Sequence, residues 1–105
     1  MARKNLQKFD AVRIPPQNLE AEQSVLGSLL LDKDAIIQVG DVVTSGDFYE
    51  ERNGIIYEAM IVLYEKRMPI DVVTLTDQLE KSKQLKEVGG ASYLSTLVNA
   101  VPTAA

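Results

Sequence analysis

The sequence contains neither cysteine nor histidine among its 105 residues. The missing thiol excludes disulfides, thiolate nucleophiles and cysteine zinc ligands, and the missing imidazole removes the commonest general base. A reducing compartment fits a cysteine-free chain, although proteins of every compartment can lack cysteine. These absences therefore restrict the chemistry of the protein more than its location.

Long apolar runs are also absent. The longest candidate, Leu29–Leu31, stops at Asp32, whereas a transmembrane helix needs roughly 20 apolar residues. The first 13 residues lack the apolar core of a signal peptide, while a basic transit-like sequence stays open as an alternative. With 46% hydrophobic and 25% charged residues, the composition predicts one ordinary soluble globular domain.

The net charge of −4 is unevenly distributed. Residues 1–13 carry +3, which leaves −7 on residues 14–105. We interpret residues 1–13 as a flexible, solvated basic tail and residues 14–105 as a helical domain. A domain that grips the DNA backbone by itself normally presents a basic face, so the acidic body argues against that role.

Helical spacing and capping residues predict the first helices. Asn18 is a candidate N-cap for a helix over 19–31, in which Gly27 is expected to mark the close approach of another backbone. Asp32 and Asp34 can cap a second helix with Ile36, Val39 and Val43 on its apolar face. The β-branched content of this second segment would also suit a buried strand.

The longest apolar pattern runs from about residue 51 to residue 66. Glu51, Glu58 and Glu65 recur every seven residues and define one narrow polar stripe, with mostly apolar side chains around the rest of the helix. A helix apolar over so much of its circumference is either central in a bundle or covered by a partner, and we favour the central position.

Two further helices follow breaks in the chain. Asp71 is a candidate cap for a helix with Val72, Leu75, Thr76 and Leu79 on one face. After Gly89 and Gly90, a fifth helix is predicted from the spacing of its apolar residues, with Pro102 ending it. The apolar residues of this last helix are Leu94, Leu97, Val98 and Val101. The pattern predicts an all-α bundle of five to six short helices.

No catalytic, cofactor-binding or metal-binding residue is predicted, and the partner-binding residues are unknown from sequence. The segment nearest to a nucleotide-binding P-loop, 40–46, is one residue too long and is followed by Asp47 instead of lysine. The acidic pairs Glu20/Glu22, Asp32/Asp34 and Glu50/Glu51 are interpreted as caps and solvated faces, because no polar pocket accompanies them and Glu20 and Glu22 face different ways.

The aromatic residues do not alternate with lysine or arginine as in a single-strand-binding platform. We expect Phe48 and Tyr49 to anchor the loop after residue 44 by burying two rings, with a partner-facing role as the alternative.

Five sequence blocks together resemble the N-terminal domain of bacterial replicative helicases of the DnaB family. They are IPPQNLEAEQSVLG (14–27), GDFY (46–49), PIDVVTL (69–75), VGGASYL (88–94) and VPTAA (101–105). The blocks occur in the family's order and span residues 14–105. The basic residues 1–13 precede them and gain no function from the resemblance.

The resemblance implies a role in assembly. In this family the domain is all-helical, joins its counterparts in a collar on a hexameric ring and helps to recruit primase. A helical hairpin and a motor that binds ATP, magnesium and single-stranded DNA are expected beyond Ala105, so the fragment itself is expected to be non-catalytic and the missing P-loop agrees with the family. The implied location is the bacterial cytoplasm, with a plastid as an alternative, and no membrane association is expected.

Two other functions were weighed. The helicase-binding domain of primase has a similar helical architecture, but the blocks at 15–27 and 88–94 favour the helicase. A small enzyme that uses its carboxylates is disfavoured by the absence of histidine and of a polar pocket. For the isolated chain we expect a monomer or a weak dimer.

Overall fold

A computed structural model of the protein describes residues 17–101, so the predicted tail lies outside the described residues. The described part contains the helices α2 (Leu19–Leu31), α3 (Ala35–Val39), α4 (Glu51–Glu65), α5 (Val72–Lys81) and α6 (Gly90–Val98), with a 3₁₀ turn η1 (Ser45–Asp47). The prediction of an all-α chain with short helices is confirmed, and the strand alternative for the second segment is wrong.

Local side chains begin two of the helices. Asn18 Oδ1 accepts a hydrogen bond from Ala21 N at 2.9 Å at the start of α2. Asp71 Oδ1 accepts one from Thr74 N at 2.8 Å at the start of α5. Each bond satisfies a backbone N–H that has no partner within its helix, which is why both caps could be predicted from sequence.

The second predicted helix is shorter than its apolar pattern. It ends at Val39, and Gly40 N donates to Ile36 O at 2.8 Å at this end of the helix. Val43 is still buried, because the chain turns after Gly40 and returns it to the core. Asp34 makes no capping bond with its side chain, and Asp32 Oδ1 instead accepts from Asp34 N.

The last helix is also shorter than predicted. It ends at Val98, because the N–H groups of Asn99 and Ala100 bond to carbonyls only three residues back. Such tighter bonds are typical of a helix end. Pro102, the predicted terminator, lies outside the described residues.

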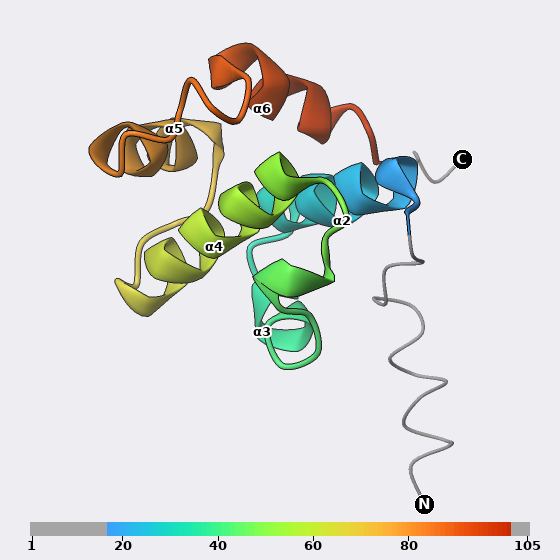
Figure 1. Cartoon of the computed structure of the whole chain (residues 1–105). Helices are drawn as coiled ribbons and strands as arrows, with labels where there is room; N and C mark the ends of the chain where they lie inside the picture. The colour runs from blue at the N-terminus through green and yellow to red at the C-terminus, as the bar shows by residue number, and fades with distance from the viewer. Residues whose placement is uncertain (1–16, 102–105) are drawn as a thin grey trace, which may run out of the picture.

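The helices pack around α4. Figure 1 shows α4 in the middle of the view with α2 behind it, α5 and α6 above and α3 below, and α4 contacts α2, α5 and η1. The central position predicted for this helix is confirmed. Its predicted polar stripe is also confirmed, since Glu51, Glu58 and Glu65 are all exposed.

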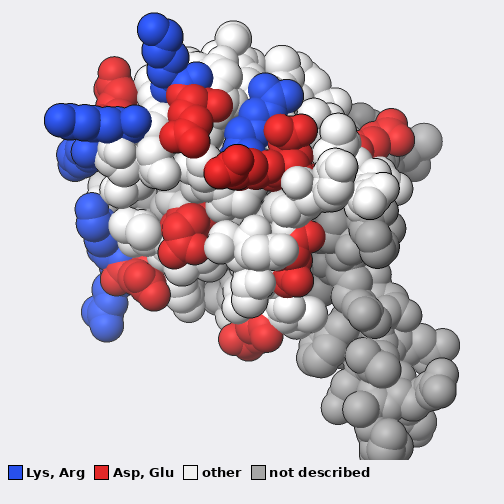
Figure 2. Space-filling model, in the orientation of Figure 1, with Lys and Arg blue, Asp and Glu red and all other residues white. Residues whose placement is uncertain are grey.

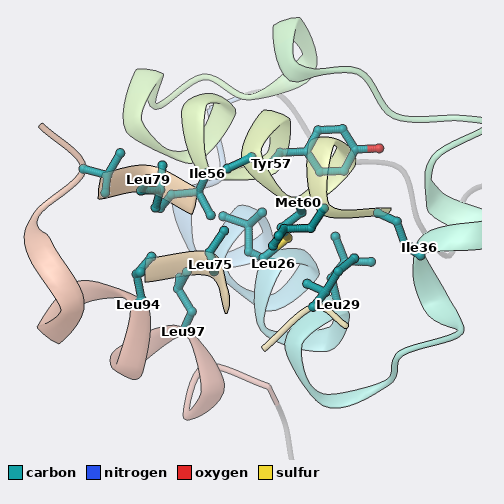
Figure 3. Packing of buried hydrophobic residues seen from close by; sticks show 14 of the residues in the cluster. Leu26, Leu29, Ile36, Ile56, Tyr57, Met60, Leu75, Leu79, Leu94 and Leu97 are labelled. Atoms are coloured by element: carbon teal, nitrogen blue, oxygen red, sulfur yellow. The ribbon is translucent and has the colours of Figure 1, made fainter. Parts of the chain in front are cut away.

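One apolar core joins all five helices. Figure 3 shows side chains from α2, α4, α5 and α6 meeting between the ribbons, with Ile36 of α3 at the edge. Leu26, Ile56, Met60 and Leu75 are fully inaccessible to solvent. Each large apolar side chain buried in this way stabilises the fold by about 1.5–3 kcal/mol.

The closest helix contact lies at Gly27, between α2 and α6. A Cβ at position 27 would lie 2.1 Å from Leu97 O and 2.7 Å from Val101 Cγ2. Ser24 Oγ, on the same helix, donates to Ala100 O at 3.1 Å. The predicted close approach at Gly27 is confirmed, and a larger residue would force the two helices apart.

Candidate functional site

The most unusual polar group of the molecule is the carboxylate of Glu22, which is fully buried. It accepts hydrogen bonds from Tyr49 N at 2.5 Å, from Glu50 N at 3.3 Å and from Asn53 Nδ2 at 2.9 Å. The interpretation of Glu22 as part of a solvated face is therefore wrong. Glu20 is exposed, so the prediction that the two acids face different ways is confirmed.

Glu22 holds the residues that lead into α4 from another helix. Glu50 occupies the N-cap position of α4 but makes no capping bond with its own side chain. The Glu22 carboxylate instead accepts from the N–H groups of Tyr49 and Glu50, the two residues just before α4, and its negative charge there suits the positive end of the helix dipole. A buried carboxylate is tolerated where hydrogen bonds replace its lost hydration, as the three donors do here.

A chain of polar contacts continues from Glu22 to α6. Asn53, which is also buried, accepts from Tyr93 Oη at 2.6 Å, and Gln23 Nε2 donates to the same Oη at 3.4 Å. The guanidinium carbon of Arg52 lies 3.7 Å from the centre of the Tyr93 ring, a cation–π geometry. We call Glu22, Gln23, Arg52, Asn53 and Tyr93 the polar cluster.

The polar cluster connects three helices and was missed from sequence. Its members come from α2, α4 and α6, and its buried amide and carboxylate have hydrogen-bond partners. A detectable signal existed: Glu22 lies four and seven positions before Leu26 and Leu29, on the buried stripe of α2. The cluster fixes how the helices sit against one another, and its residues do not line either of the two hollows beside α4 described below.

The segment that most resembled a P-loop has a different structure. Gly40 follows α3, and the segment 44–47 forms a capped 3₁₀ turn in which Thr44 N donates to Asp47 Oδ2 at 2.7 Å. A phosphate cradle needs outward backbone N–H groups and a lysine. Here the Asp47 carboxylate accepts a hydrogen bond from the N–H of Thr44, so this segment does not fit a nucleotide phosphate.

Tyr57 fixes the end of the same loop. Its hydroxyl donates to Val43 O at 2.7 Å, and its ring lies 5.3 Å from the Phe48 ring. Burial, together with the nearby carboxylates of Asp47 and Glu58, raises the pKa of Tyr57 from its ordinary value of 10.0 to about 12. The raised pKa reflects the burial of the hydroxyl beside two carboxylates, and it keeps the hydroxyl protonated as the donor to Val43 O.

The prediction that two rings anchor this loop is half correct. Phe48 is buried, whereas Tyr49 is 65% exposed. The backbone of Tyr49 is held by Glu22, so its ring projects outward from a fixed position. The exposed ring leaves the alternative of a partner-facing role available to Tyr49.

Two hollows mark the surface beside α4. The first, of about 380 Å³, lies between α3 and α4 and includes the exposed side chains of Ile37 and Tyr64. The second, of about 410 Å³, lies between η1, α4 and the loop after α5, and we call it the acid-rimmed groove. It is lined by Ser45, Gly46, Phe48, Tyr49, Glu51, Gly54, Ile55, Glu58 and Gln84.

Charge on the visible face is sorted by sign. Figure 2 shows carboxylates spread over the middle of this face, with most lysine and arginine side chains toward its left and upper edges. Residues 17–101 contain no cluster of acidic side chains arranged to hold a metal ion. Within the same residues, no helix has the length and apolarity needed to cross a membrane.

The fold defines the chain as a small all-α domain built around one central helix. A family model described as "DnaB-like helicase N terminal domain" matches residues 14–105. The chain therefore belongs to the family of DnaB-like helicase N-terminal domains. This result confirms the resemblance seen in the five sequence blocks and favours the helicase over a primase domain.

Individual relatives agree with the family. The chain is 50% identical over 93 residues to the replicative DNA helicase DnaB of Leifsonia xyli, covering 89% of this chain and 20% of that protein. It is 49% identical over 96 residues to DnaB of Mycobacterium leprae, covering 91% of this chain and 16% of that protein. The chain thus spans about a fifth or less of these helicases.

A solved structure has the same fold. The crystal structure of the N-terminal domain of DnaB helicase from Mycobacterium tuberculosis superposes with a TM-score of 0.81 at 47% sequence identity. The match covers 86% of this chain and 65% of that one. Similarity of this degree in both sequence and fold supports the same domain architecture.

Proposed function

We propose that this domain is a non-catalytic assembly and docking module of a hexameric, ATP-dependent replicative DNA helicase that recruits primase. The observation that carries the proposal is the match of residues 14–105 to a helicase N-terminal domain, at about half identity to helicases several times longer. ATP, magnesium and DNA would be bound by a motor domain outside this chain, in the bacterial cytoplasm.

The surface of the domain supports a role in protein contacts. The large apolar side chains of Ile37, Tyr49, Tyr64 and Val73 are exposed, although the core residues of the same domain are buried. Exposed aromatic and aliphatic side chains of this size are typical of protein interfaces. The described residues carry no group arranged to bind nucleotide, which leaves contact with proteins as the function best supported.

Three measurements test the proposal. Titration of the cognate primase's C-terminal domain into the ¹⁵N-labelled protein should shift amide resonances at high micromolar concentration, and no shift would contradict primase docking by these residues. Sedimentation over a range of concentrations should give a monomer or a weak dimer. ATP turnover by the pure chain, abolished by a substitution within it, would contradict the non-catalytic role.

A further inference from the structure

The acid-rimmed groove combines an apolar floor with charge of one sign. Phe48, Gly54 and Ile55 supply apolar surface, and among residues 17–101 the charged side chains that line the groove are Glu51 and Glu58. Both carboxylates are exposed, and they lie two helical turns apart on α4. An occupant that complements this groove needs an apolar side chain flanked by cations.

The chain contains one segment with that chemistry. Residues 1–13 carry four basic residues and one acidic residue, whereas the remainder of the chain is strongly acidic. The apolar residues Leu6, Phe9 and Val12 are interspersed among the basic ones. This charge asymmetry makes residues 1–13 the part of the sequence that best complements Glu51 and Glu58.

The groove is within reach of this segment. The Glu22 carboxylate contacts the backbone of Tyr49, which lines the groove, so the first turn of α2 begins beside it. From Glu22 back to Leu19 the helix rises only about 4.5 Å. Residues 13–19 can span up to about 20 Å and residues 1–13 about 40 Å, so their length exceeds what binding requires.

We propose that residues 1–13 bind in the acid-rimmed groove of their own chain, with basic side chains near Glu51 and Glu58 and an apolar side chain over Ile55. Both carboxylates are exposed, so the attraction is weak and screened by salt. The segment would then compete with any partner protein that uses the same surface.

The absence of cysteine allows a direct test on the full chain. A nitroxide attached to Ala2→Cys should attenuate the amide resonances of Gly46, Gly54 and Ile55 more strongly than those on the exposed face of α5. In 0.5 M NaCl the paramagnetic effect at the groove should fall at least twofold. Equal attenuation at the groove and at α5 would overturn the proposal and leave the groove to a separate partner.

Charge variants and mixed samples complete the test. Glu51→Gln/Glu58→Gln should reduce the effect at least twofold, whereas the control Glu65→Gln/Glu80→Gln, which changes the net charge equally outside the groove, should retain it. An unchanged effect in the groove variant would overturn the proposal. A mixture of spin-labelled ¹⁴N protein and unlabelled ¹⁵N protein tests whether the effect is intramolecular. If the ¹⁵N resonances of the groove were attenuated in full in this mixture, residues 1–13 of a second copy would occupy the groove and the proposal would be overturned.

Discussion

Replacing Glu22 with glutamine tests whether the buried carboxylate stabilises the domain. The carboxylate accepts three hydrogen bonds, two of them from backbone N–H groups at the start of α4. Glutamine keeps one acceptor oxygen but replaces the other with an NH₂ group, which cannot accept a hydrogen bond. At least one of the three bonds to the charged carboxylate is therefore lost, and the N–H group that made it is left without a partner. Such bonds contribute about 1.5–3 kcal/mol each, and we expect a loss of about 2–4 kcal/mol.

Urea unfolding followed by far-ultraviolet circular dichroism at pH 7 measures this loss. With a slope of about 1–2 kcal/mol per M, the midpoint should fall by roughly 1–4 M while the slope stays the same. The control Glu20→Gln removes an exposed carboxylate from the same helix turn and should change the free energy of unfolding by no more than about 0.5 kcal/mol. A Glu22→Gln variant as stable as the wild type would mean that desolvation of the charge cancels its hydrogen bonds, and the reasoning would be refuted.

Three further substitutions test other contacts by the same unfolding assay. Gly27→Ala should destabilise by about 1–3 kcal/mol because its Cβ would collide with Leu97 O, and a gain of about 1 kcal/mol would show that helix propensity prevails instead. Tyr57→Phe should cost about 1–2 kcal/mol at pH 7 through the lost bond to Val43. Because the folded-state pKa of Tyr57 is about 12 and the unfolded value is 10.0, its contribution is complete below pH 10 and is lost as the pH rises from 10 to 12. The stability difference between wild type and Tyr57→Phe should therefore shrink over that interval, and a constant difference would contradict the raised pKa. Lys83 has a left-handed φ of 60° after α5, so Lys83→Gly should stabilise by about 0.5–1 kcal/mol, and a loss would contradict backbone strain there.

The parts of the fold that depend on local chemistry could be predicted from sequence. Asn18 and Asp71 cap helices that begin one residue later, and both capping bonds span only three positions. The exposed stripe of α4 follows from a seven-residue spacing visible in the sequence. The predicted ends of α3 and α6 were less accurate. These helices end at Val39 and Val98, whereas the apolar spacing in the sequence continues past the point where the backbone turns.

The polar cluster could not be predicted because its contacts are distant in sequence. Glu22 meets Asn53 across 31 positions, and Asn53 meets Tyr93 across 40. A glutamate is usually exposed, and only its place on the apolar stripe of α2 marked it as different. The outward ring of Tyr49 was missed for a related reason, since its direction is set by the bond between its backbone and Glu22.

The contacts that Glu22 makes with the residues before α4 also have a consequence for how the domain opens. Glu50, the N-cap residue of α4, makes no capping bond with its own side chain, and its N–H is bound by a carboxylate that lies 28 positions earlier, on α2. An isolated helix of 15 residues is only marginally stable in water. Because α2 supplies the acceptor for the N–H groups just before α4, we expect the two helices to lose their hydrogen-exchange protection together.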